Sequence, residues 1–440
     1  MKNRYILAVI IILLSFITML SGCARESVNH APEEPVINAL EEETDISENA
    51  MGSELDASLE NEPNISDEVF PWKIAIITNS GDEEEYRSVE RLTEMVGEER
   101  VTHRTALPAF GWFDWGPIIE EIAGDSEIRA VVVSSLDFFL DRNGRLQSAA
   151  IDELLKMRDD IFVVYTGPIS YPLSPISVAE RANLIIETNY GMIGELFVMQ
   201  AIEMGAETIV HYSFTRHSYV PFIANRREAM KVAAERNGIS FVDIYALDPV
   251  EASTADAIVF IERDLPIQTG EFGVNTAFFG TSCTFQGAII SQVMETGAIF
   301  VQPCCISPYD GFPAGLDIEH RIPTGENQDT YLIELNELIS AIDDAVDDGG
   351  MSGRIAGWAV TGRFMWKEVG FMYAVEWING GVPQERGVIC LDVLERLARE
   401  YKAELGIDSD IILDTLNFDG NELSNFVSGT IGHYVFGRNN

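Results

Sequence analysis

Basic residues are scarce in this sequence. Its 440 residues include 29 Lys and Arg against 71 Asp and Glu, which gives a formal net charge of −42 at pH 7. A surface this acidic repels phosphate backbones, so we expect no nucleic-acid partner.

Cysteine is also scarce, with only Cys23, Cys283, Cys304, Cys305 and Cys390. Five cysteines in a chain of this length do not form a disulfide framework. A single bridge from Cys283 to either Cys304 or Cys305 is compatible with an oxidising compartment, and the sequence leaves that choice open. No CxxC pair or His-rich spacing indicates a metal site, and we predict no cofactor.

The sequence lacks the motifs of common enzyme classes. It has no Gly-x-Ser-x-Gly elbow, no phosphate-binding loop and no zinc-hydrolase spacing. Cys304 or Cys305 could act as a nucleophile with a distant His, but nothing in the sequence places a base beside either thiol. We therefore predict that the protein is not an enzyme.

The N-terminus contains an export signal. Lys2 and Arg4 precede an apolar run over 5–20 that is too short, and wrongly flanked, for a spanning helix. Leu20-Ser21-Gly22-Cys23 resembles a bacterial lipobox, which is cut before a cysteine that is then lipidated. We expect a signal peptide over 1–22 and a lipid on Cys23 that holds the protein on the extracytoplasmic face of the cell membrane. A retained membrane anchor with an incidental cysteine is the alternative.

The next segment, 23–70, is rich in Asp and Glu and has little apolar periodicity. Such a composition cannot bury enough surface to offset the entropy lost on ordering. We predict a lipidated N-terminus followed by an acidic disordered linker.

From residue 71 onward, short apolar runs alternate with helical patterns. The runs that we predict as strands are 72–78, 100–105, 130–134, 161–166, 183–187, 208–212, 241–245, 276–280 and 299–302. This order predicts an α/β fold with two Rossmann-like lobes, each a parallel sheet flanked by helices.

Several segments carry a more specific resemblance. They are 186–196, with Thr188-Asn189 ahead of a helix, then 226–239, 276–288, 355–360 and 368–380. In this order they resemble the crossovers and second-lobe helices of the type I periplasmic binding proteins, the superfamily of ribose-binding proteins and lactose-repressor-type ligand domains. The phrases at 211–214 and 302–312 resemble an uncharacterised family of bacterial lipoproteins with that fold.

The resemblance implies two lobes joined by hinge crossovers. We place lobe 1 at 71–190 with a return segment at about 355–385, lobe 2 at 191–350, and a C-terminal extension at 386–440. Within this extension 388–404 is predicted to be helical, and 411–440 receives no prediction. Sugar-binding members carry an Asp where this chain has Ser282 and Cys283, which argues against a simple sugar as ligand.

Candidate ligand-binding residues follow the predicted strands, because ligands of open α/β sheets bind beyond the carboxyl ends of strands. These polar residues, each of which could instead cap a helix, are Asn79, Ser80, Ser134, Ser135, Thr166, Arg216, His217, Thr281, Ser282 and Gln302. Trp112 and Trp115 lie in an aromatic loop suited to stacking. Either Arg226 or Arg227 matches the ligand-contacting Arg of the superfamily. Tyr309 and Asp310 follow the last strand, and we interpret Asp310 as a turn residue before Gly311.

These features together predict a monomeric, membrane-anchored solute-binding lipoprotein. It would close on a small polar molecule, sugar-like or anionic, and present it to an ABC transporter permease. A sensory receptor that signals to a membrane partner needs the same cleft and is the alternative. A DNA-binding repressor fits poorly, because the export signal and linker occupy the place of a DNA-binding domain.

Overall fold

The computed structural model describes residues 72–79, 83–106, 108–109, 112–113, 116–134, 150–167, 174–324, 329–406 and 409–437. All of them lie within one unit, Glu68–Asn440. The predicted signal peptide, Cys23 and the acidic linker lie outside these residues, as do Ser80, Trp115 and Ser135 and the side chains of Asn79 and Trp112. Within the ranges given, no helix is long and apolar enough to cross a bilayer.

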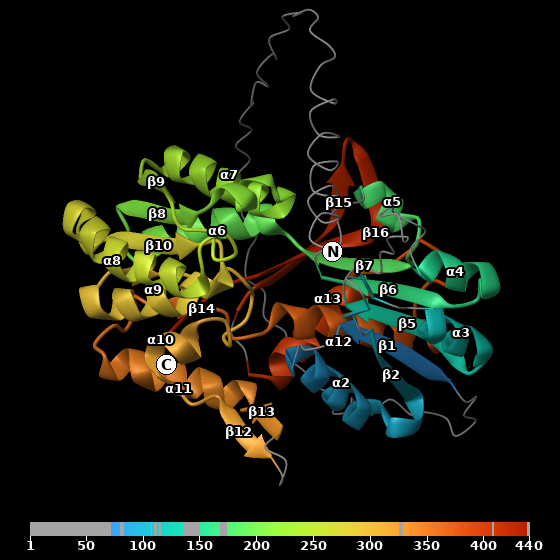
Figure 1. Ribbon diagram of the computed structural model, residues 1–440. Helices are drawn as coiled ribbons and strands as arrows, with labels where there is room; N and C mark the ends of the chain where they lie inside the picture. Colours follow the sequence, from blue (N-terminus) through green and yellow to red (C-terminus); the bar gives the residue numbers. More distant parts are fainter. Residues whose placement is uncertain are drawn as a thin grey trace, which may run out of the picture. The chain divides into compact units, whose positions relative to one another are not determined.

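The first lobe is built on a seven-stranded sheet with the order β15-β16-β7-β6-β5-β1-β2 (Figure 1). Its strands are β1 Lys73–Asn79, β2 Val101–Ala106, β5 Ile128–Ser134, β6 Phe162–Thr166, β7 Leu184–Thr188, β15 Ile411–Phe418 and β16 Asn421–Ile431. All neighbours pair in parallel except β15 and β16, which form an antiparallel hairpin. The inner strands are apolar on both faces, as expected for a parallel sheet covered by helices on each side.

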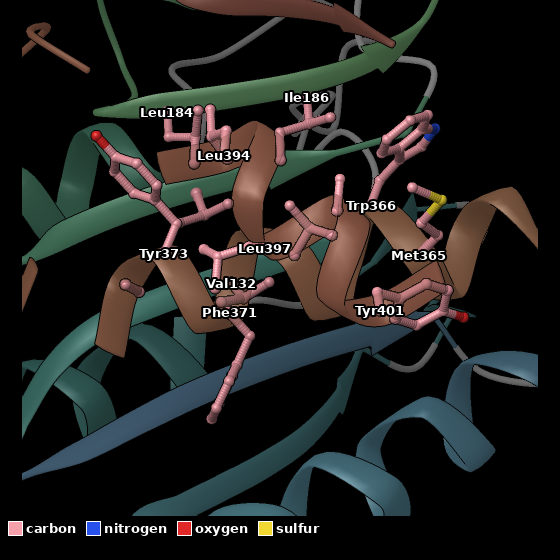
Figure 2. Close-up of a cluster of buried hydrophobic side chains, with 14 of the residues drawn as sticks. Val132, Leu184, Ile186, Met365, Trp366, Phe371, Tyr373, Leu394, Leu397 and Tyr401 are labelled. Carbon is pink, nitrogen blue, oxygen red and sulfur yellow. The ribbon is translucent and has the colours of Figure 1, made fainter. Parts of the chain in front are cut away.

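Helices cover both faces of this sheet, and successive residues of β1 show the alternation. Ile74 and Ile76 face α2 (Glu83–Val96), α12 (Gly362–Ile378) and α13 (Leu391–Glu404). Ala75 and Ile77 face α3 (Gly116–Gly124), α4 (Ala150–Met157) and α5 (Pro175–Ala179). Figure 2 shows side chains of α12 and α13 packed against strand residues such as Leu184 and Ile186.

The second lobe has a four-stranded parallel sheet with the order β11-β10-β8-β9. Its strands are β8 Thr208–Ser213, β9 Ser240–Tyr245, β10 Thr276–Gly280 and β11 Ile299–Phe300. One face packs on α6 (Tyr190–Glu203) and α7 (Pro221–Asn237). The other packs on α8 (Thr254–Phe272), α9 (Cys283–Thr296), α10 (Phe312–Leu316) and α11 (Leu335–Asp348). A short hairpin of β12 (Arg321–Thr324) and β13 (Asp329–Leu332) lies between α10 and α11 in the chain.

Within the described ranges, the chain passes between the two sheets three times. It leaves the first sheet after β7, returns between β14 (Ala356–Gly357) and α12, and leaves again between β16 and β17 (Tyr434–Val435). β14 and β17 pair with each other, and Phe300 of β11 bridges to Ile355. Hinge crossovers therefore join two α/β lobes, and the predicted fold class is confirmed.

The segment after residue 386 belongs to this framework. The helix predicted over 388–404 is observed as α13, which packs on the first sheet. β15 and β16 extend that sheet beyond β7, and β17 returns to the second lobe. No strand was predicted here, and three are present.

Candidate functional site

A pocket of about 280 Å³ lies between the two lobes at the carboxyl ends of their strands. From the first lobe it is lined by Glu84, Gly167, Thr188, Gly362 and Trp366. From the second it is lined by Tyr190, Cys283, Cys305, Ile306, Ser307, Tyr309 and Asp310. This position agrees with the rule that open α/β sheets bind ligands beyond the carboxyl ends of their strands.

The aromatic side chains of Tyr190, Tyr309 and Trp366 form much of the apolar wall, and other contacts fix their orientation. The Tyr190 ring packs against Phe222, with centroids 4.8 Å apart. The Trp366 Nε1–H donates to Thr188 Oγ1 at 3.2 Å. The Tyr309 hydroxyl donates to the carbonyl of Ile333 at 2.6 Å. Aromatic rings held in this way offer stacking area without losing rotamer entropy on binding.

Two carboxyl groups supply much of the polarity of the pocket. Glu84 Oε1 accepts a hydrogen bond from the Ser307 hydroxyl at 3.0 Å. Burial raises the pKa of Asp310 to about 8, so this carboxyl is largely protonated near neutral pH. Among the lining residues that the structure describes there is no Lys or Arg. The pocket thus offers carboxyl and hydroxyl groups, and its lining favours an uncharged or cationic ligand over an anion.

Polar contacts also join the lobes beside the pocket. Arg87 of α2 donates to the carbonyl of Leu332 at 2.6 Å and pairs with Glu334 at 3.1 Å. Arg321 of β12 pairs with Glu83 at 2.5 Å. Because at least one partner of each ion pair is exposed to solvent, such pairs contribute little stability each and can break as the lobes move apart.

One wall of the pocket contains a cluster of sulfur atoms. Cys283 Sγ lies 3.2 Å from Cys304 Sγ and 3.3 Å from Cys305 Sγ, and the two adjacent cysteines are 3.8 Å apart at sulfur. These separations exceed the ~2.05 Å of a disulfide bond. Asp310 Oδ2 lies 3.4 Å from Cys304 Sγ and accepts from the Cys305 backbone N–H at 3.3 Å.

Comparison with known sequences identifies the family. Residues 72–356 match the family described as a protein of unknown function, DUF3798. The chain belongs to the DUF3798 family. Two uncharacterized proteins of Treponema pallidum (strain Nichols) are similar to this DUF3798 chain. One is 29% identical over 182 residues, which is 41% of this chain and 79% of that protein. The other is 30% identical over 100 residues, which is 23% of this chain and 44% of that protein.

Solved structures give the fold. A candidate transcriptional regulator from Clostridium difficile 630 superposes with a TM-score of 0.67 at 19% identity, covering 84% of this chain and 100% of that chain. A periplasmic ribose ABC transporter structure from Conexibacter woesei DSM 14684 has a TM-score of 0.44 at 13% identity, covering 77% and 98%. With its two parallel sheets and three crossovers, this DUF3798 protein has the type I periplasmic-binding-protein fold, and the predicted resemblance is confirmed.

The predicted strand-end residues lie at or near the ends of their strands in this DUF3798 chain. Ser134 and Thr166 end β5 and β6, and both are buried. Thr281 is buried and donates to Ser213 Oγ at 3.2 Å, while Ser282 caps α9. Gln302 is buried and lies 2.6 Å from His433 Nε2. Of the residues singled out from the sequence whose side chains are described, Tyr309 and Asp310 line the pocket, and Thr166 and Ser282 directly precede lining residues. Asp310 precedes Gly311 as expected, but its carboxyl also contacts Cys304 Sγ and the Cys305 backbone N–H, so it is more than a turn residue.

The predicted arginines of the second lobe are engaged within that lobe. Arg216 makes a bidentate pair with Asp248 at 2.8 and 2.9 Å and lowers the pKa of that carboxyl to about 2. Arg227 makes a similar bidentate pair with Asp243, in which Arg227 Nε lies 2.8 Å from Asp243 Oδ1. An anionic ligand would therefore have to compete with Asp248 for the guanidinium of Arg216, or with Asp243 for that of Arg227.

His217 and Arg226 have structural contacts as well. His217 Nδ1 lies 2.9 Å from Thr281 Oγ1, and burial lowers the pKa of the imidazole to about 4. Arg226 is buried, donates to the Cys304 carbonyl at 2.7 Å, and lies over the rings of Tyr190 and Phe279. Arg226 therefore supports the pocket wall from behind.

Sequence reasoning did not select most of the lining residues. Glu84, Tyr190 and Trp366 lie near the starts of helices whose preceding strands or crossovers were correctly placed. Their place in the chain could have identified them. A helix that follows a strand begins at the edge of the sheet where the strands have their carboxyl ends, which is where ligands bind.

Proposed function

We propose that this protein is a solute receptor that binds a small hydroxylated molecule, uncharged or cationic, between its two lobes. The observation that carries the proposal is the inter-lobe pocket of about 280 Å³, with side chains from both lobes. A ligand that contacts both lobes binds best when they are close, so its binding energy stabilises the closed arrangement.

The lining defines the class of ligand. Aromatic rings of Tyr190, Tyr309 and Trp366 suit the faces of a sugar-like or cyclic ligand. The carboxyl of Glu84 suits hydroxyl or ammonium donors, and the largely protonated carboxyl of Asp310 suits hydroxyl groups. An anionic solute is disfavoured, because Arg216 and Arg227 already hold carboxylates.

The cellular role extends the predictions made from the N-terminus. We propose that a lipid on Cys23 holds the receptor on the extracytoplasmic face of the membrane and that an ABC permease receives the solute. A sensory receptor with the same closure is the alternative. Deleting the gene for this protein should abolish uptake of the solute if the first role holds, and leave uptake unchanged while a response to the solute is lost if the second holds.

A ligand screen tests the central claim. Neutral polyols, sugars, cationic and anionic small molecules are each added to residues 24–440, and thermal unfolding and native mass spectrometry are recorded. A ligand at 100 times its dissociation constant should stabilise the fold by ~2.7 kcal/mol. A screen in which only anions bind would contradict the proposed class.

A matched pair of variants then locates the site. Glu84→Gln should weaken binding of the identified ligand by about 10- to 150-fold, which corresponds to ~1.5–3 kcal/mol for a hydrogen bond to a charged group. Glu98→Gln, which changes an exposed carboxylate outside the pocket, is the control. Equal affinities in the two variants would place the site elsewhere. Trp112→Ala and Trp115→Ala should be measured alongside, since their predicted stacking role is independent of Glu84.

A further inference from the structure

We propose that Cys283, Cys304, Cys305 and Asp310 form a binding site for a thiolate-preferring divalent cation of the Zn²⁺ class. Each residue offers one ligand atom, and the four atoms all lie within 4.8 Å of one another. The inference goes beyond solute binding, because neither activity requires the other.

The geometry matches tetrahedral coordination. An ion about 2.3 Å from sulfur and about 2.0 Å from a carboxylate oxygen sets neighbouring sulfurs roughly 3.8 Å apart, and sulfur and oxygen roughly 3.5 Å apart. The observed sulfur–sulfur distances are 3.2, 3.3 and 3.8 Å, and Cys304 Sγ lies 3.4 Å from Asp310 Oδ2. Cys283 Sγ would have to move about half an ångström from the other two sulfurs, whereas the Cys304–Cys305 and Cys304–Asp310 separations are already near those of a tetrahedral site.

Packing of the backbone brings the ligands together from two segments. Cys283 begins α9, whereas the other three follow β11 in the loop that leads to α10. Gly311 has φ 87° and lies so close to α9 that a Cβ there would be 2.2 Å from Gln286 Cβ. This contact holds the loop against the first turns of the helix. The site is therefore preorganised, as a metal site requires.

Hydrogen bonds also position the ligands. Arg226 donates a hydrogen bond to the Cys304 carbonyl at 2.7 Å, and the Cys305 backbone N–H donates one to Asp310 Oδ2 at 3.3 Å. Outer contacts of this kind orient ligands and raise metal affinity.

Positive charge beside the cluster partly offsets the charge of thiolate ligands. On binding, the three thiols and the Asp310 carboxyl each release a proton to solvent, and the ion is held by three thiolates and a carboxylate. The positive charge of buried Arg226 and the N-terminal end of α9 offset part of the resulting negative charge. Soft sulfur ligands select Zn²⁺ over Mg²⁺ or Ca²⁺, which prefer oxygen.

The site is reachable from solvent. Cys283 is exposed, and Cys283, Cys305 and Asp310 all line the inter-lobe pocket. An ion held there would become part of the pocket wall.

Metal titration of the mature chain, reduced and handled without oxygen, tests the proposal. We expect one Zn²⁺ per chain and, with Co²⁺ as probe, a thiolate charge-transfer band with the visible bands of a tetrahedral ion. Cys283→Ser and Cys305→Ser should each weaken Zn²⁺ binding by more than the 10- to 100-fold typical of outer contacts. Asp310→Asn should weaken it while keeping the thiolate band.

Cys390→Ser is the matched control, because Cys390 lies at the start of α13 outside the cluster. It should bind Zn²⁺ like the parent. The proposal is overturned if the reduced parent gives no thiolate band, or if Cys283→Ser and Cys305→Ser, shown to be folded by circular dichroism, bind like Cys390→Ser. A disulfide among the three cysteines in protein isolated from its own cells would also overturn it. The metal titration uses different probes from the solute screen, so failure of one proposal is distinguishable from failure of the other.

Discussion

Replacing Phe426 by Ala tests whether the C-terminal hairpin is part of the core of the first lobe. Phe426 lies on β16, is 1% exposed, and packs with Ile185 and Tyr165 in the cluster beneath α3 to α5. Truncating a buried Phe removes its transfer free energy and leaves a cavity, which together cost about 3–5 kcal/mol. We expect the free energy of unfolding to fall by that amount.

Urea unfolding followed by circular dichroism measures the change. With an m-value of about 3 kcal/mol/M, the midpoint should fall by roughly 1–1.7 M. Ile412→Ala on the adjacent strand is the control, because Ile412 is 47% exposed and surface changes usually stay within about 0.5 kcal/mol.

The reasoning would be refuted if Phe426→Ala and Ile412→Ala had the same midpoint. That result would mean that β15 and β16 add little to the first lobe and behave as an appended extension. A shift confined to a separate, earlier transition would lead to the same conclusion.

Three further predictions follow from other contacts. Burial lowers the pKa of His433 to about 3. Between about pH 6.5 and 3 the unfolded chain therefore binds a proton at this residue and the folded chain does not. The stability advantage of the parent over His433→Gln should therefore shrink as pH falls from about 6.5 toward 3, measured by urea unfolding at several pH values. In Gly429→Ala the added Cβ would lie 2.6 Å from the ring of Trp366, which lines the pocket, so the affinity for the ligand should fall. Gly270→Ala is the control, because Gly270 has open space around it, and this variant should bind the ligand like the parent. Cys23→Ala should release the protein from the membrane or leave an uncleaved precursor, as cell fractionation and mass would show; unchanged attachment at mature length would contradict a lipid on Cys23.

The repeating α/β pattern was readable because each parallel strand is a short run of apolar residues. Residues 130–134 illustrate this, since both faces of β5 are buried and its side chains therefore need no alternation. Helix ends were readable where glycine must adopt a left-handed conformation. Gly238, with φ 70°, ends α7.

The C-terminal hairpin was missed despite a local signal. Asp419 and Gly420 have φ of 51° and 78°, which is the turn that an Asp-Gly pair favours between strands. The alternation around this turn is imperfect because a bulge lies between Thr415 and Leu416. Pairing of β16 with β7 joins residues far apart in the sequence, and local pattern does not report such contacts.

The candidate site was harder to predict because its parts meet only in the folded chain. Arg216 and Arg227 suggested an anion site, but each is paired with a carboxylate of the same lobe. Arg216 pairs with Asp248, just after β9, and Arg227 pairs with Asp243 within β9. The sulfur cluster had no recognisable spacing, since Cys283 lies 21 residues before Cys304 on a different element. Its formation depends on the approach of Gly311 to α9, which a sequence motif does not encode.

The position of β16 beside β7 has a consequence for synthesis of the protein. Strand β7 ends at Thr188 and β16 begins at Asn421, and the second lobe from α6 to β14, all but β17, is made between them. A growing chain therefore carries the first five strands of the larger sheet with the far edge of β7 uncovered, while most of the second lobe is already made. An uncovered edge of this kind is a template for pairing with other chains. Whatever accompanies the nascent chain must shield β7 while about half of the protein is still being made.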